Sequence, residues 1–269
     1  MRKSRWIRRN AALSESVRAV ERALDVLLCF TSQTPELTMT QIADQTGINK
    51  STVHRLLGTL EKRRFVHRDP ATGAYQLGIR LFQMAYLTLE HNDLRRLATP
   101  FLRRLCEQYQ ENVDLSVLDD MDVVFVNHLE GPQRVKVASA TGQRLPAFAT
   151  ASGRANLAYL SDEAVRGILA RGMPRYTQYT PLSPEAVFED LRLIRERGVA
   201  FSEQEYEDGI NAVAAPILDG SNRPFAAVAI VGPAYRLTRD RMIEIGPTLA
   251  ATANEIAREL AMGLLAVTA

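Results

Sequence analysis

The sequence predicts an α+β protein. We expect an N-terminal winged helix-turn-helix, a linker helix and a larger C-terminal domain in which helices flank an antiparallel sheet. Three observations support this prediction. A helix-turn-helix pattern occupies residues 39–58, two short β-prone runs follow it, and beyond residue 112 short apolar runs alternate with turns. With 269 residues, 46% of them hydrophobic, the chain is long enough to form two cores.

The helix-turn-helix prediction depends on the stretch MTQIADQTGINKSTVHRLLG, residues 39–58. Ala43 is small where two crossing helices approach closely, and Gly47 suits the positive φ of a tight turn. The expected apolar seam consists of Ile42, Ile48, Val53, Leu56 and Leu57. Outward-pointing donors for base edges and phosphates are expected at Asn49, Lys50, Ser51, His54 and Arg55. An ordinary helical hairpin with a solvated face is the alternative, but the flanking elements favour DNA binding.

Elements on both sides complete a winged form of this motif. Before it, residues 17–30 predict a helix that closes the small core. Its expected inward face consists of Val17, Val20, Ala23, Leu24, Leu27 and Leu28. After it, residues 65–66 and 75–77 are predicted strands, joined by the turn residues 69–73. Arg68 lies near the tip of this hairpin, where it is expected to contact a phosphate or the minor groove.

Positive charge is concentrated in the first third of the chain. Through Arg80 there are 14 Lys and Arg against 7 Asp and Glu, and the remainder holds 19 against 24. This asymmetry is expected when only the first part binds a polyanion. Residues 1–15 are predicted to be a basic disordered arm, since no apolar signal-peptide segment follows the charges, and no run is long enough to span a bilayer. Two isolated cysteines, Cys29 and Cys106, fit a reducing cytoplasm.

The sequence predicts four segments: the arm at 1–15, the winged helix-turn-helix at 16–78, the linker helix at 79–94 and the larger domain at 95–269. Pro100 is expected to interrupt the helical pattern that runs to about residue 110. Strands are predicted at residues 113–118, 123–127, 135–138, 199–202, 212–218 and 225–231. Helices are predicted at residues 152–160, 162–171, 184–197 and 238–265. Ser183 and Pro184 supply a cap and a first-turn proline for the third of these helices.

The residue pattern does not favour an enzyme, although a metabolic enzyme with a winged helix used for protein contacts is the alternative. The histidines His54, His67, His91 and His128 lack metal-ligand spacing. Neither a Gly-rich phosphate loop nor a nucleophile elbow is present, so no cofactor or metal ion is expected. His128 is expected on the surface, with contact to a ligand carboxylate as the alternative. Phe125 is expected in the core, with a place in a cavity wall as the alternative. The acidic cluster Glu203, Glu205, Glu207 and Asp208 is expected to form a solvated loop or to pair with Arg195 and Arg197.

Several separate motifs, in the same order, resemble the IclR family of transcription regulators. In the first part they are SVRAVERALDVL, LTMTQIADQTGINKSTVHRLLGTLEKRRFV and YQLGIRL. In the second they are RLPAFATASGRANLAYL, RERGVAFSEQEYEDGINAVAAPILD and AAVAIVGP. The resemblance covers residues 16–260 and implies a winged helix, a linker helix and a GAF-like effector domain. It also implies a homodimer or dimer of dimers that binds a palindromic operator in double-stranded DNA and responds to a small metabolite.

The resemblance also implies site residues. DNA contacts are implied for Lys50, Ser51, Thr52, His54 and Arg55 in the second helix, and for Arg68 in the wing. The positions that match the family's ligand cavity are Thr150, Ala151, Ser202, Ala212, Ala229 and Val231. Leu145 and Phe148 are further effector-binding candidates, with core packing as their alternative. For Thr150, Ser152 and Ser202 the alternative is a local hydroxyl–backbone bond.

The effector prediction rests on departures from the family pattern. Ala212, Ala229 and Val231 stand where members that bind very small polar acids carry hydroxyls and a thiol. Apolar side chains there favour a ligand with an apolar body. The RLPAFATASGRA stretch, with Arg154 where many members have lysine, resembles the branch that governs aromatic-acid catabolism. An aromatic carboxylate or a related ring compound is therefore the predicted effector.

Overall fold

The computed structural model describes residues 17–31, 34–81, 83–84 and 93–267. The chain divides into two compact units whose boundary falls between His91 and Asn92, and each unit is described by itself. The basic arm predicted at residues 1–15 lies outside the described residues, as does much of the linker helix predicted at residues 79–94.

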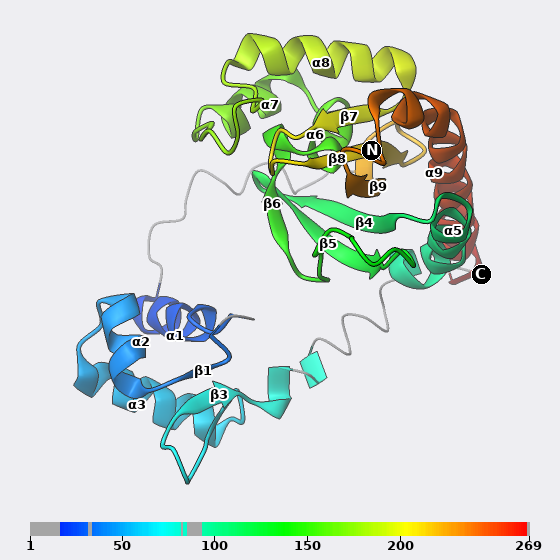
Figure 1. Ribbon diagram of the computed structural model, residues 1–269. Helices are drawn as coiled ribbons and strands as arrows, with labels where there is room; N and C mark the ends of the chain where they lie inside the picture. Colours follow the sequence, from blue (N-terminus) through cyan, green and yellow to red (C-terminus); the bar gives the residue numbers. More distant parts are fainter. Residues whose placement is uncertain (1–16, 32–33, 82, 85–92, 268–269) are drawn as a thin grey trace, which may run out of the picture. The chain divides into compact units, whose positions relative to one another are not determined.

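The first unit is a winged helix-turn-helix (Figure 1). Its helices are α1 (Arg18–Leu28), α2 (Met39–Thr46) and α3 (Lys50–Lys62). The strands β1 (Glu36–Leu37), β2 (Val66–Arg68) and β3 (Tyr75–Leu77) form an antiparallel sheet in the order β1-β3-β2. Thr38 and Gln41 form a capping box that begins α2, and Gly47 ends it with φ 66°. The predicted seam residues Ile42, Ile48, Val53 and Leu57 are buried, and Leu56 is partly buried.

The face of α1 that packs inward differs from the prediction. Val26 and Phe30 belong to the buried core of this unit, with Leu27 partly buried beside them. Four of the residues predicted to be buried are instead more than half exposed within the chain: Val17, Val20, Leu24 and Leu28. The prediction was therefore wrong for these four residues. Helical periodicity identifies an apolar face of a helix, but it does not determine which other element packs against that face.

The second unit contains a six-stranded antiparallel sheet in the order β6-β5-β4-β9-β8-β7. Its strands are β4 (Asn112–Asp119), β5 (Asp122–Leu129), β6 (Arg144–Pro146), β7 (Ala200–Glu203), β8 (Ile210–Leu218) and β9 (Pro224–Pro233). The predicted strand at residues 135–138 is wrong, because the outer edge of β5 pairs with residues 144–146 instead. A β-prone run becomes a strand only where a neighbouring strand accepts its hydrogen bonds.

Helices cover both faces of this sheet (Figure 1). On one face lie α5 (Asp93–Tyr109) and α9 (Arg239–Val267); on the other lie η1 (Ala147–Ala149), α6 (Ala151–Leu157), α7 (Asp162–Leu169) and α8 (Pro184–Arg197). Contrary to the prediction, α5 continues through Pro100, and its buried side chains pack on the sheet to either side of the proline. None of the helices in the described ranges combines the length and apolar character needed to cross a bilayer.

Strand alternation separates two cores and thereby places the pocket described below. On β9, Val228 and Ile230 face α5 and α9, whereas Ala227 and Ala229 belong to the core beneath α6, α7 and α8. Small side chains on this second face let α6 lie close to β8 and β9. Gly153 of α6 packs equally closely against η1, since a Cβ there would lie 2.1 Å from the backbone oxygen of Ala147.

Candidate functional site

The exposed side of α3 carries the residues predicted to contact DNA. Lys50, Ser51, His54 and Arg55 are exposed and Thr52 is partly buried, while Val53 and Leu57 anchor the opposite side in the core. Asn49 is the N-cap of α3. Its Oδ1 accepts hydrogen bonds from the Thr52 backbone N–H and the Ser51 hydroxyl, both at 2.9 Å. The side-chain oxygen of Asn49 therefore fixes the first turn of α3.

The wing also presents its predicted residue to solvent. Arg68 ends β2 and is exposed. Its Nε donates to the backbone oxygen of Gly73 at 3.4 Å, and its guanidinium lies 5.8 Å from the centre of the Tyr75 ring. Asp69 orders the turn by accepting hydrogen bonds from the Ala71 N–H and the Thr72 hydroxyl. The hairpin therefore holds one cation in place beside an aromatic ring.

The second unit contains a pocket on the α6 side of its sheet. The empty space within it is about 590 Å³, which includes the part that is open to solvent. Its lining residues are Asp114, Phe125, Val137, Ala138, Ser139, Gln143, Leu145, Thr150, Ala151, Ser152, Ser202, Tyr206, Glu207, Ile210, Ala212 and Val231. The lining is largely apolar, and none of these residues is Lys, Arg or His.

Six of the eight predicted effector-binding residues line this pocket: Leu145, Thr150, Ala151, Ser202, Ala212 and Val231. Phe148 and Ala229 do not. They are 3% and 1% exposed and belong to the core beneath α6, α7 and α8. Ala229 lies next to the pocket in the sheet. Its register partner on β4 is the lining residue Asp114, and its partner on β8 is Ala214. The Thr150 hydroxyl is already used locally: it donates to the Pro146 oxygen at 3.0 Å and accepts from the Gly153 N–H.

Several lining residues were missed by the sequence reasoning. Phe125 is buried, as expected, and it also lines the pocket. The loop residues Tyr206 and Glu207 line it as well, although nothing local in the sequence marks them. Asp114 could have been singled out from the sequence. A carboxylate between Val113 and Leu115 in a buried strand requires a specific partner or role.

Asp114 forms a buried pair with His128, so the prediction of a surface histidine was wrong. Asp114 Oδ1 lies 2.6 Å from His128 Nδ1, and the two side chains are 1% and 9% exposed. Cross-strand register explains the contact, since the two residues are directly opposite each other on β4 and β5. Burial raises the pKa of Asp114, opposed by the hydrogen bond and charge of His128 and by the Ser139 hydroxyl. Asp114 Oδ2 is buried without a hydrogen-bond partner among the described residues.

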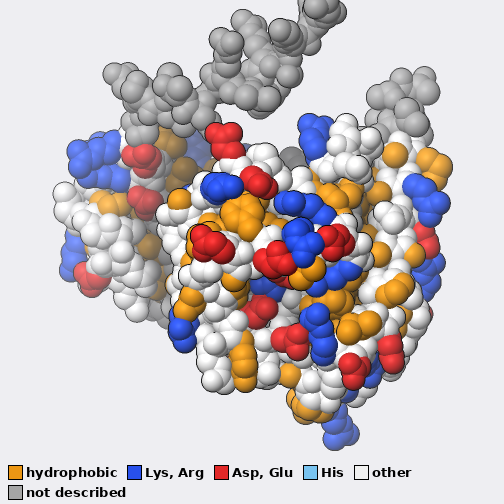
Figure 2. Space-filling view, turned by 90° about the horizontal axis from the view of Figure 1, so that it is seen from above, with side chains coloured by type: hydrophobic (Ala, Val, Ile, Leu, Met, Phe, Trp, Pro, Cys, Tyr) orange, Lys and Arg blue, Asp and Glu red, His pale blue; other side chains and the backbone are white. Residues whose placement is uncertain are grey.

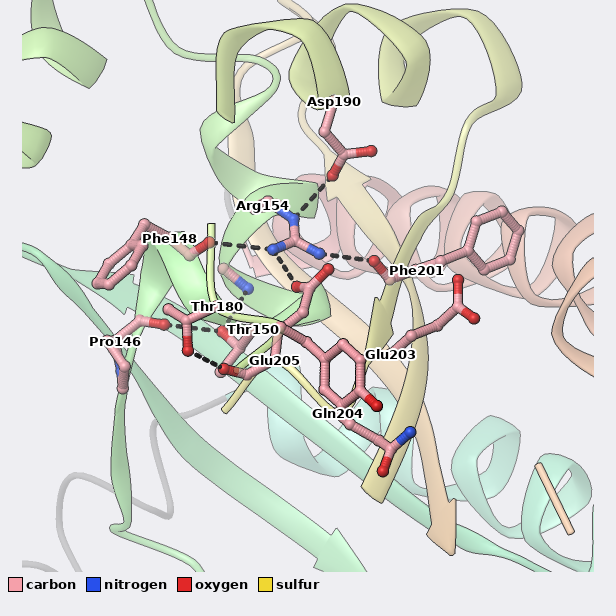
Figure 3. Close-up of polar contacts among 12 residues, drawn as sticks. Pro146, Phe148, Thr150, Arg154, Thr180, Asp190, Phe201, Glu203, Gln204 and Glu205 are labelled. Atoms are coloured by element: carbon pink, nitrogen blue, oxygen red, sulfur yellow. Dashed lines mark hydrogen bonds and ion pairs between the residues drawn. The ribbon is translucent and has the colours of Figure 1, made fainter. Parts of the chain in front are cut away.

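A buried arginine joins several elements of the second unit (Figure 3). Arg154 of α6 is 2% exposed and forms ion pairs with Glu205 and, at 2.7 Å, with Asp190 Oδ2. It also donates to the backbone oxygens of Phe148 at 3.1 Å and Phe201 at 2.6 Å. Arg154 thus joins α6, α8, β7 and the loop after β7.

This network assigns Glu205 a different partner from those predicted. Glu205 pairs with Arg154 rather than with Arg195 or Arg197. Burial raises the pKa of Glu205, and the charge and hydrogen bond of Arg154 oppose that rise. The Thr180 hydroxyl donates to the Glu205 backbone oxygen at 2.7 Å (Figure 3). These contacts fix the loop that brings Tyr206 and Glu207 to the pocket.

The outer face of the second unit around α8 has a different charge pattern from α3. Figure 2 shows acidic and basic side chains intermixed there with apolar ones. Arg192 pairs with both Glu189 and Glu196, and Arg195 lies 3.6 Å from Asp162. Charges that neutralise one another in this way do not favour a polyanion. Across the described ranges, no group of three His, Cys, Asp or Glu side chains is arranged to hold a metal ion.

A winged helix-turn-helix unit with exposed cations on α3 defines the class of protein: a DNA-binding regulator, here with a second unit that contains a pocket. Comparisons with known proteins agree. Residues 19–70 match the IclR helix-turn-helix domain, and residues 86–258 match the bacterial transcriptional regulator IclR C-terminal domain. The chain therefore belongs to the IclR family, and it is a DNA-binding transcription regulator of that family.

Individual relatives show the extent of the similarity. The chain is 33% identical over 249 residues to the transcriptional repressor IclR of Escherichia coli K12, covering 91% of each chain. The IclR transcriptional regulator of Alicyclobacillus acidocaldarius has a similar structure, with a TM-score of 0.81, 28% identity and coverage of 91% of this chain and 99% of that one. An IclR homologue of Microbacterium hydrocarbonoxydans, solved in complex with 4-hydroxybenzoate, gives a TM-score of 0.78, 25% identity and coverage of 89% and 99%.

Proposed function

We propose that this regulator binds a palindromic operator through α3 and the wing, and that a ring compound in the pocket of the second unit alters that binding. The observation that supports the proposal best is the separation of two surfaces. Exposed donors and cations lie on α3 of one unit, and a pocket without basic residues in its lining lies in the other. A homodimer, or a dimer of dimers, would present two α3 helices to two half-sites.

On α3, Arg55 reads a base and Lys50 and Ser51 contact phosphate. The exposed guanidinium of Arg55 has the planar fork that suits guanine, while Lys50 and Ser51 lie in the first turn fixed by Asn49. Thr52 and His54 complete the set on α3, and Arg68 contributes from the wing.

The effector is an aromatic acid or a related ring compound. Phe125, Leu145 and Val231 give the pocket an apolar wall that matches a ring. The complex of the Microbacterium homologue with 4-hydroxybenzoate supports a ring compound as a ligand for this fold. Between a carboxylate and a neutral ring compound, the lining favours the neutral one, because Asp114 and Glu207 are acidic and no lining residue is basic.

The effector acts by differential affinity. A ligand shifts operator binding only if it binds more tightly to one state of the regulator than to the other. The loop fixed by Arg154 and Glu205 contacts the pocket through Tyr206, so ligand binding there is coupled to a packed network of the second unit.

The experiment measures binding of the full-length protein to a duplex from the region upstream of its own coding sequence, with and without ring compounds. Ala212→Phe fills the pocket from β8 and is expected to remove the ligand response while leaving operator binding intact. Operator binding that is lost in this variant, or a ligand response that survives it, would contradict the proposed site.

A further inference from the structure

The floor of the pocket holds a carboxylate whose capacity to accept hydrogen bonds is only partly used by the protein itself. Asp114 lines the pocket and its side chain is 1% exposed. One oxygen, Oδ1, is taken by His128 Nδ1 at 2.6 Å. The other, Oδ2, is buried and has no hydrogen-bond partner among the described residues. Leaving a buried carboxylate oxygen without a partner is costly, so such an atom in a binding pocket indicates a ligand group that satisfies it.

The charge of the lining determines which ligand group this is. Asp114 and Glu207 are the two ionisable carboxyl groups of the lining, and no lining residue is basic. A ligand carboxylate next to Asp114 would meet a like charge, and His128, the adjacent group that can carry a positive charge, is already bound to Oδ1. A hydroxyl or amino group carries the proton that Oδ2 accepts, and the apolar neighbours exclude competing water.

Cross-strand packing holds Asp114 in position for this role. His128, opposite it on β5, fixes Oδ1, which in turn fixes the direction of Oδ2. The Ser139 hydroxyl, on the loop that also lines the pocket, lies close enough to interact with the carboxylate. Phe125, on the same strand as His128, supplies an apolar surface for a ring in the same pocket.

We propose that Asp114 is the specificity-determining residue of the effector site, and that its Oδ2 accepts a hydrogen bond from a hydroxyl or amino substituent on a ring-shaped effector. The inference rests on the proposed function and narrows its ligand class. The effector is a phenol-like or aniline-like compound, and the end of the molecule that meets Asp114 is not a carboxylate.

The test compares three probes of similar size by calorimetric titration of the full-length protein: 4-methylphenol, 4-methylanisole and 4-methylbenzoate. We expect 4-methylphenol to bind about tenfold more tightly than 4-methylanisole, which retains the ring and the oxygen but cannot donate. We expect 4-methylbenzoate to bind more weakly than 4-methylphenol. Equal affinities, tighter binding of either comparison compound, or no binding of 4-methylphenol at millimolar concentration would overturn the proposal.

Two variants separate hydrogen bonding from size and from charge. In Asp114→Asn, with the carbonyl oxygen retained by His128, the amide NH₂ takes the place of Oδ2, so the preference for 4-methylphenol over 4-methylanisole is expected to vanish or invert. Glu207→Gln removes the other carboxylate of the lining and is expected to keep that preference. If Asp114→Asn still prefers 4-methylphenol, the preference comes from the added methyl group of 4-methylanisole and not from a hydrogen bond to Asp114, and the proposal is overturned. If Asp114→Asn does not fold, the probe comparison on the parent protein still decides.

Operator binding by the same preparations tests the proposed function separately. A protein that binds the upstream duplex and responds to ring compounds, but does not distinguish the phenol from its methyl ether, retains the proposed function and loses this inference. A protein that binds the phenol selectively but does not bind duplex DNA loses the proposed function, while the role of Asp114 stands.

Discussion

Replacing Arg154 by methionine tests the network that fixes the wall of the pocket. Arg154 is 2% exposed and is the common partner of Asp190 and Glu205. Methionine keeps an unbranched apolar chain but removes the charge and the donors, so Glu205 and the Phe148 and Phe201 carbonyl oxygens lose a partner. Asp190 keeps its second ion pair, with Arg197 at 2.8 Å. Removing one member of a buried ion pair leaves an uncompensated charge, which is strongly destabilising.

The expected loss in the free energy of unfolding is about 3 kcal/mol, the lower end of the range for breaking a buried pair. The lower end applies because Asp190 and Glu205 are 27% and 20% exposed and can recover part of their hydration. Urea unfolding followed by circular dichroism measures this loss. Arg154→Lys is the matched variant: it keeps the charge but cannot contact both carboxylates and both carbonyl oxygens, so an intermediate loss is expected.

A double variant gives the decisive comparison. Combining Arg154→Met with Glu205→Gln removes the uncompensated charge of Glu205 and leaves the Asp190–Arg197 pair in place, so it should recover part of the stability lost in Arg154→Met alone. If Arg154→Met costs less than about 1 kcal/mol, or if the double variant is less stable still, the network does not stabilise the pocket wall as described.

Three further predictions concern DNA, pH and close packing. Arg55→Ala should weaken specific operator binding by about 1–3 kcal/mol in a gel-shift titration; unchanged affinity would refute the base contact. Burial raises the pKa of Asp114 in the folded state, so stability falls as pH rises from the unfolded pKa of about 3.9 through the folded value. Asp114→Asn should lose this fall in urea unfolding, and an unchanged pH profile would contradict it. Gly153→Ala should lower stability by about 1–3 kcal/mol, because the added Cβ would collide with the Ala147 backbone. Gly167→Ala in α7, where an added Cβ would touch no other atom, should raise stability by up to about 1 kcal/mol. Thermal unfolding of both variants tests this contrast.

Local signals predicted the elements whose ends are set by nearby residues. Ser183 caps α8 and Gly198 ends it with φ 76°, so the predicted helix at residues 184–197 matches the structure. The turn of the helix-turn-helix at Gly47 is set in the same local way. Features that depend on distant partners were not predictable. The inward face of α1 depends on α2 and α3, and the edge strand next to β5 depends on which segment pairs with it.

The pocket residues show the same difference between features set by nearby residues and features that depend on distant partners. Residues in contiguous motifs, such as Thr150 and Ala151, line it as the resemblance implied. Phe148 and Ala229 lie next to such residues in sequence or in the sheet but face the core. The pairing of Asp114 with His128 required the register of β4 and β5, which no local pattern specifies.

The central claim is that one unit binds duplex DNA and that the pocket of the other modulates this binding. Fluorescence anisotropy of a labelled upstream duplex, titrated with full-length protein across a range of salt concentrations with and without 4-methylphenol, tests it most directly. The account predicts affinity that falls steeply with salt, because phosphate contacts release counterions, and that shifts on ligand addition in the parent protein but not in Ala212→Phe. Binding that does not depend on salt, or a ligand shift of equal size in Ala212→Phe, would contradict it.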